Sequence, residues 1–176
     1  MLAIEKCPVP ANTLLNTYSI PGAYVDCYTT EVPGQVPFSE FIFAFYTTLL
    51  FKLERLILKL TVSRPSTDIQ ARQLADGDIE KFAAWHVENR SENEILLCDL
   101  IGRTRSWLMV IPADAHGAPQ TRLYFGSAVV PVRNSKTGTP ALGFAFQVLL
   151  GFHRIYSVLL LYSAKASIHR QRRITH

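Results

Sequence analysis

The stretch ALGFAFQVLLGFHRIYSVLLLYSA, residues Ala141–Ala164, is the longest apolar run in the chain, and the rest of the fold must accommodate it. Only Gln147, His153, Arg154, Ser157 and Ser163 interrupt it with polar groups. A run of this length is typical of a membrane-spanning helix or of a helix buried in a large core. Because an arginine at the centre of a span opposes insertion by about 3 kcal/mol, His153 and Arg154 favour the buried helix.

Composition predicts one domain with a large interior. The chain has 176 residues, of which 48% are apolar and 18% charged, and its formal net charge is +4. A chain with this many apolar residues buries them in a core or an interface, or else places some of them against lipid. Peripheral membrane contact therefore stays an alternative. The three cysteines are odd in number and scattered, which indicates a reducing cytoplasm rather than a disulfide framework or a zinc site.

Local patterns divide the chain into an extended lead-in at residues 1–22, one domain at 23–168 and a basic tail at 169–176. Within the domain we expect a strand at 23–32, a mostly buried helix from Ser39 to about Leu60 and a short helix opened by a capping box of Thr67 and Gln70. Four strands, or three with one interrupted, are then expected at Phe82–Arg90, Glu94–Ile101, Thr104–Pro112 and Thr121–Val132. A surface loop is expected at Ala113–Gln120, and the final helix follows the last strand.

This order predicts an α+β protein in which a curved antiparallel sheet wraps its most apolar helix. It resembles the helix-grip fold of the START-like superfamily, which includes polyketide cyclases and pollen-allergen lipid carriers. The resemblance covers residues 23–168 and rests on element order. The family's meander is longer, so either a strand is missing here or one of the predicted strands is two. The resemblance implies a ligand cavity between the sheet and the last helix.

Strand alternation indicates which polar groups share the face of the sheet that packs on this helix. If Gly102-Arg103 forms a two-residue hairpin turn, Asp99 pairs with Ser106 and Leu97 with Leu108. Trp85 of the preceding strand then joins Asp99 and Ser106 on one largely apolar face. Asp99 is interpreted either as a ligand-orienting group or general base, or as a structural residue. In the structural case it accepts from Ser106 and Trp85 or lies near the turn, where water reaches it.

The final helix and the final strand supply the remaining candidate ligand-binding residues. His153 and Tyr156 lie on one face of the helix, and Tyr124 is added from the strand if the register permits. Each of these two helix residues can also be interpreted as a core side chain whose polar atoms are hydrogen-bonded and which has no role in binding. Together with Trp85, Asp99 and Ser106, these residues form the predicted ligand-binding site.

The opposite face of the sheet is also apolar, which predicts a second cover. A sheet with one solvated face would alternate to polar residues there, and a large exposed apolar patch invites aggregation. We therefore expect a homodimer formed through this face. The residues that predict it are Leu96, Cys98, Trp107 and Met109.

The function predicted from these patterns is non-catalytic binding of a small hydrophobic or amphipathic ligand between the sheet and the last helix. A cyclase- or dehydratase-type enzyme using Asp99 with His153 or Tyr156 is the first alternative. A membrane-peripheral protein and a protein-interaction domain are the others. We find no catalytic motif, no metal-ligand spacing and no cofactor signature, and the basic tail lacks the aromatic residues of a nucleic-acid surface.

Overall fold

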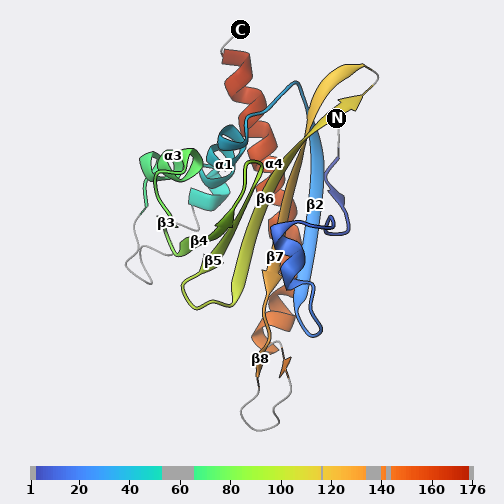
Figure 1. The fold of residues 1–176 in the computed structure, drawn as a ribbon, viewed down its shortest axis with the longest axis vertical. Helices are drawn as coiled ribbons and strands as arrows, with labels where there is room; N and C mark the ends of the chain where they lie inside the picture. Colours follow the sequence, from blue (N-terminus) through green and yellow to red (C-terminus); the bar gives the residue numbers. More distant parts are fainter. Residues whose placement is uncertain (1–2, 53–65, 116, 134–139, 142–143, 175–176) are drawn as a thin grey trace.

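A seven-stranded antiparallel sheet forms the centre of the protein in a computed structural model that describes residues 3–52, 66–115, 117–133, 140–141 and 144–174 (Figure 1). Its strands lie in the order β1-β2-β7-β6-β5-β4-β3. The predicted α+β class, with an antiparallel sheet and a C-terminal helix, is confirmed. The strands of this sheet are β1 (Glu5–Lys6), β2 (Tyr24–Pro33), β3 (Lys81–Phe82), β4 (Trp85–Arg90), β5 (Glu94–Asp99), β6 (Thr104–Ala115) and β7 (Ala118–Val129).

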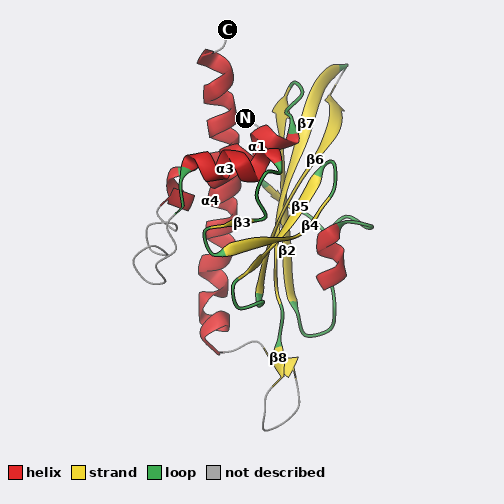
Figure 2. Ribbon diagram, turned by 60° about the vertical axis from the view of Figure 1, so that its left-hand side comes forward, coloured by secondary structure: helices red, strands yellow, loops and turns green. Residues whose placement is uncertain are grey.

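The helices cover the sheet on both sides (Figure 2). Helices α1 (Phe38–Tyr46) and α4 (Phe144–Ile174) pack on one face, which we call the inner face, and the 3-10 helix η1 (Leu14–Tyr18) packs on the opposite, outer face. Tyr28, Ile95, Leu97, Leu108, Leu123 and Phe125 of the strands point to the inner face and form the main core with α1 and α4.

The pairing of β5 with β6 is shifted by two residues from the predicted register. Leu97 lies opposite Ser106, not Leu108, and a four-residue loop replaces the two-residue turn. Gly102 in this loop has a φ of 72°, a left-handed conformation that glycine adopts without strain. Because a shift of two residues leaves each side chain on its original face, the predicted division of faces is right although the pairs are wrong.

Two of the predicted strand boundaries also change. The segment predicted as one strand at Phe82–Arg90 is β3 and β4, since Ala83 between them has a φ of 53° and interrupts the pairing. The predicted loop Ala113–Gln120 instead continues β6 and β7 to the pair Ala115 and Ala118. The resulting hairpin projects beyond the rest of the sheet (Figure 1).

The predicted single helix from Ser39 to Leu60 is wrong at its middle. Helix α1 ends at Tyr46, with Thr47 as its C-cap, and the Thr48 hydroxyl then accepts a hydrogen bond from the Phe51 N–H at 3.2 Å. Thr48 therefore caps a new helical turn, as a serine or threonine does at a helix start. The remainder of the predicted helix lies outside the described residues.

The capping box of α3 (Asp68–Asp76) is confirmed. The Thr67 hydroxyl accepts from the Gln70 N–H at 3.2 Å, and the Gln70 side chain accepts from the Thr67 N–H at 3.0 Å. The helix ends at Gly77, which has a φ of 88°. Both boundaries follow from local sequence alone.

Helix α4 starts later and ends later than predicted. Pro140 and Ala141 belong to a short strand, β9 (Pro140–Ala141), which pairs with β8 (Val132–Arg133). At its other end the helix continues through the predicted basic tail, where Arg172 donates to the Pro33 carbonyl at 2.7 Å. Within the described part of the chain, no helix combines the length and the hydropathy needed to cross a membrane.

The N-terminal segment covers the outer face, although we predicted an extended lead-in. Strand β1 pairs with β2, and Leu15 of η1 is completely buried. The four residues that predicted a homodimer, Leu96, Cys98, Trp107 and Met109, are at most 6% exposed in the single chain. Their burial needs no partner, so the reason for the homodimer is removed and the dimer itself stays a prediction.

Candidate functional site

A row of polar side chains crosses the inner face beneath α4. Asp26 of β2 lies directly opposite Ser127 of β7, and Ser127 lies directly opposite Ser106 of β6. All three side chains are buried, at 2%, 2% and 7% exposure. Buried polar groups carry a free-energy penalty unless they are hydrogen-bonded, so their partners decide what this row can do.

Asp26 is a buried carboxylate with several donors around it. It accepts from the Ser127 hydroxyl at 2.6 Å, from the Ser127 N–H at 3.2 Å and from the Tyr24 hydroxyl at 3.0 Å. Burial raises the pKa of Tyr24 to about 12, against the opposing effect of the nearby Arg154. Tyr24 therefore stays protonated at neutral pH and remains a donor to Asp26.

At the other end of the row, Ser106 meets the end of α1. Its hydroxyl lies 3.3 Å from that of Tyr46, which is completely buried. The Tyr46 ring packs edge-on against Phe51 and Phe82, with centroids 4.8 and 5.6 Å away. This aromatic packing fixes the direction of the Tyr46 hydroxyl toward the sheet.

The predicted contact of Asp99 with Ser106 is absent, because the shifted register places Ser106 opposite Leu97. Asp99 is half-buried and accepts from the Arg103 N–H at 2.8 Å, which holds the loop between β5 and β6. Trp85 lies beside Asp99 on the inner face. The Trp85 indole N–H is buried, and no hydrogen-bond partner for it is found among the described residues.

Helix α4 runs along β2 and closes the site from above. Arg154 lies near Tyr24 at one end, and the Lys165 ammonium donates to the Thr30 hydroxyl at 2.8 Å farther along. Ser157 lies one helical turn beyond Arg154, is 0% exposed, and its hydroxyl has no partner among the described residues. A buried hydroxyl without a partner is unusual in a folded protein and requires an explanation.

The remaining predicted site residues separate. Tyr156 is half-buried and packs against the inner-face core. Tyr124 lies on the outer face, with its ring centroid 6.1 Å from that of Trp107, so it cannot line the space under α4. His153 belongs to α4, but its side chain lies outside the described part of the structure.

The structure thus brings Trp85, Ser106 and Tyr156 to the inner face and adds residues that we did not predict: Asp26, Ser127, Tyr46 and Ser157. Asp26 could have been found, because alternation along YVDCYTTEV places it on one face with Tyr24 and Tyr28. No group of three or more metal-ligating side chains occurs in the described residues. The site therefore offers hydrogen bonds from hydroxyls, an indole and a carboxylate on apolar walls.

Comparison with known proteins adds little to this description. No protein-family model matches the chain, and no curated protein matches its sequence. Among solved structures, the protein Ms6760 from Mycobacterium smegmatis is similar over 98% of this chain and 100% of its own, with 12% identity and a TM-score of 0.37. A similarity at that level supports no functional inference.

Proposed function

We propose that this protein binds a small apolar or amphipathic molecule between the inner face of the sheet and helix α4, as the helix-grip resemblance implies. The observation that carries the proposal concerns two buried polar atoms on this side of the sheet, the Trp85 indole nitrogen and the Ser157 hydroxyl, for which the described part of the chain offers no hydrogen-bond partner. Folded proteins leave few such groups unsatisfied.

The walls of the proposed site have the composition of a binding pocket. Apolar side chains of the sheet, such as Leu108 and Phe125, alternate with the polar row of Asp26, Ser127 and Ser106. Pockets for small molecules are mostly apolar and carry a few placed polar groups that fix orientation. The hydrophobic part of a ligand would lie on the apolar rows. Its polar end would accept a hydrogen bond from the Trp85 indole N–H, or donate a hydrogen bond to the Ser157 hydroxyl or accept one from it.

The enzyme alternative loses the base that we assigned to it. Asp99 accepts the Arg103 N–H and stabilises a loop, so it has a structural task. Tyr156, its proposed partner, packs into the apolar core. We therefore favour binding without catalysis.

Binding of the fluorescent amphiphile anilinonaphthalene sulfonate tests the proposal, because the chain contains one tryptophan on each face. Replacing Trp85 by Phe removes the inner indole N–H, and replacing Trp107 by Phe makes the same change on the outer face. We expect Trp85→Phe and Ser157→Ala each to weaken binding about 3- to 10-fold, the effect of one hydrogen bond near 1 kcal/mol. Trp107→Phe should leave the affinity unchanged.

Fluorescence titration of the full chain measures these affinities, and native mass spectrometry of the purified protein shows whether a ligand copurifies. Saturable binding that depends on Trp85 and Ser157 supports the proposal. Absence of saturable binding by a protein stripped of any copurified ligand, or an equal loss in all three variants, would overturn it.

A further inference from the structure

Two cysteines on the outer face, the side of the sheet opposite the proposed ligand site, face each other near the edge of the sheet. Cys7 follows β1, and the pairing of Lys6 with Tyr28 continues so that Cys7 lies opposite Cys27 of β2. The Cys7 N–H donates to the Cys27 carbonyl at 3.0 Å, and the two sulfur atoms are 3.3 Å apart. Directly opposed residues on antiparallel strands have Cβ atoms about 4.5–5.5 Å apart, near the separation that a disulfide needs.

The two thiols differ in their exposure to solvent. Cys7 is half-buried, and both Cys7 and Cys27 border a hollow of about 440 Å³ whose lining includes Lys6 and Val9. Cys7 also borders a second hollow of about 350 Å³ beside Arg122. Cys27 is only 1% exposed. A reagent can therefore reach the sulfur of Cys7 first.

The surroundings also make the two thiols chemically different. The hydrogen bond between the two thiols lowers the pKa of Cys7, and the positive charge of Arg122 adds to this effect, although burial and Glu5 oppose it. The same hydrogen bond, together with burial, raises the pKa of Cys27. Since the thiolate is the reactive form of cysteine, Cys7 is the nucleophile of the pair.

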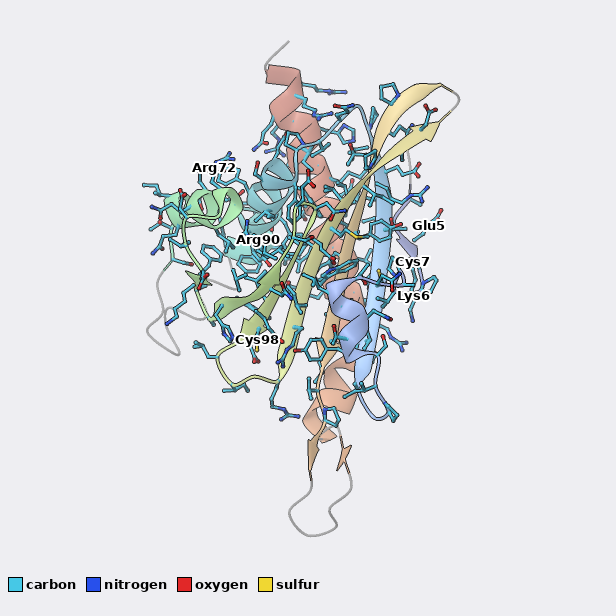
Figure 3. All side chains as sticks on the ribbon, in the orientation of Figure 1. Glu5, Lys6, Cys7, Arg72, Arg90 and Cys98 are labelled. Atoms are coloured by element: carbon cyan, nitrogen blue, oxygen red, sulfur yellow. The ribbon has the colours of Figure 1, made fainter. Side chains whose placement is uncertain are left out.

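We propose that Cys7 and Cys27 form an oxidisable dithiol, in which a peroxide oxidises Cys7 and Cys27 then closes an intramolecular disulfide. The distance between the sulfur atoms, the exposure of one and the burial of the other support this assignment. Figure 3 shows Cys7 on the N-terminal segment beside β2, while Cys98, the third cysteine, lies elsewhere on β5.

With hydrogen peroxide as the oxidant, the reaction balances in two steps. The Cys7 thiolate attacks one oxygen of the peroxide, the O–O bond breaks, and the departing hydroxide takes a proton to become water. The sulfenic acid left on Cys7 is then attacked by the sulfur of Cys27. Its hydroxyl leaves as a second water with the proton of the Cys27 thiol, so two thiols lose two electrons to one peroxide.

A bond at this place would fasten the N-terminal segment to the sheet. The chain between Cys7 and Cys27 contains η1, whose Leu15 is buried against the outer face. Closing a loop of this size restricts the unfolded chain and raises stability. We expect oxidation to raise the Tm of the full chain by about 5–10 °C.

Peptide mass analysis tests the proposal directly, because trypsin releases residues 7–52 as one peptide that contains Cys7 and Cys27 but not Cys98. After treatment of the folded protein with hydrogen peroxide and alkylation of the remaining thiols, we expect this peptide unalkylated and lighter by two hydrogen atoms. The peptide that contains Cys98 should remain alkylated.

Matched variants separate the pair from the third cysteine. Cys98→Ser should still form the bond, whereas Cys7→Ser should not. Cys27→Ser should leave a sulfenic acid on Cys7 that dimedone traps. Oxidation confined to Cys98, an intermolecular disulfide in place of the internal one, or alkylation of both Cys7 and Cys27 after peroxide treatment would overturn the proposal. Because the wild-type chain carries the main measurement, a variant that fails to fold does not prevent the test.

Discussion

The two faces of the sheet differ in the side chains that they bury and in the segments that cover them. On the inner face, the row of Asp26, Ser127 and Ser106 is polar and lies under long helices. On the outer face, the next row contains Cys27, Gly126 and Trp107 and lies under the short N-terminal segment.

This difference separates two tasks. On the inner face, Trp85 and Ser157 each have a buried polar atom with no partner in the described ranges, which supports the proposed binding. Trp107 shows the contrast on the outer face, because its indole N–H donates to the Glu94 carboxylate at 2.7 Å. The same carboxylate oxygen accepts the Leu14 N–H at 3.0 Å, so Glu94 joins the sheet to η1. We infer that the outer face stabilises the fold and that the inner face provides the ligand site.

The largest effect is expected from removing the centre of the outer face. Trp107→Ala deletes a side chain that is 0% exposed and removes the indole N–H that donates a hydrogen bond to the Glu94 carboxylate. We expect the free energy of unfolding to fall by about 3–5 kcal/mol, measured by urea denaturation. Leu100→Ala, at a side chain that is 51% exposed, is the control and should change stability by less than about 0.5 kcal/mol. Equal losses would contradict a structural role for the outer face.

The next effect tests whether the N-terminal segment is fitted to the sheet. A Cβ at Gly126 would overlap the Leu15 side chain and lie 2.9 Å from the Asp26 carbonyl oxygen. We therefore expect Gly126→Ala to lower the free energy of unfolding by about 1–3 kcal/mol and to expose the N-terminal segment to protease. In a double-mutant cycle, Leu15→Ala should relieve part of this loss. Strict additivity would show that Leu15 does not meet this position.

A smaller loss is expected on the inner face. Ser127→Ala removes the shortest bond to Asp26, at 2.6 Å, while other donors to this carboxylate remain. We expect the free energy of unfolding to decrease by about 1–2 kcal/mol. Ser91→Ala, at an exposed serine, serves as the control in the same denaturation experiment. If the two variants are equally stable, the polar row contributes nothing to the fold.

The smallest effect is expected at Ser157. Because its buried hydroxyl has no partner among the described residues, Ser157→Ala should change the free energy of unfolding by less than about 0.5 kcal/mol, or raise it slightly. The same variant should weaken ligand binding. Thermal unfolding of the ligand-free protein provides the measurement, and a loss above about 1 kcal/mol would indicate a structural bond at this hydroxyl.

Part of the candidate site could be predicted because alternation along a strand is a local signal. Trp85 and Ser106 were placed on the inner face even though the register was wrong by two residues. Tyr124 was misplaced because no local pattern fixes which face of β7 joins the helix. The partners of Asp26 and Ser157 depend on contacts between distant segments, and those contacts leave no mark in a short window of sequence.

The sequence alone determined the α+β class, the two faces of the strands and the capping box of Thr67 and Gln70, since each depends on neighbours a few residues apart. Only the tertiary structure decided that the N-terminal segment covers Trp107 and that Cys7 meets Cys27. Both contacts join positions many residues apart, and they form because strand pairing and burial of apolar surface bring the segments together. The long apolar stretch predicted a buried helix, but its register along β2 was fixed by packing.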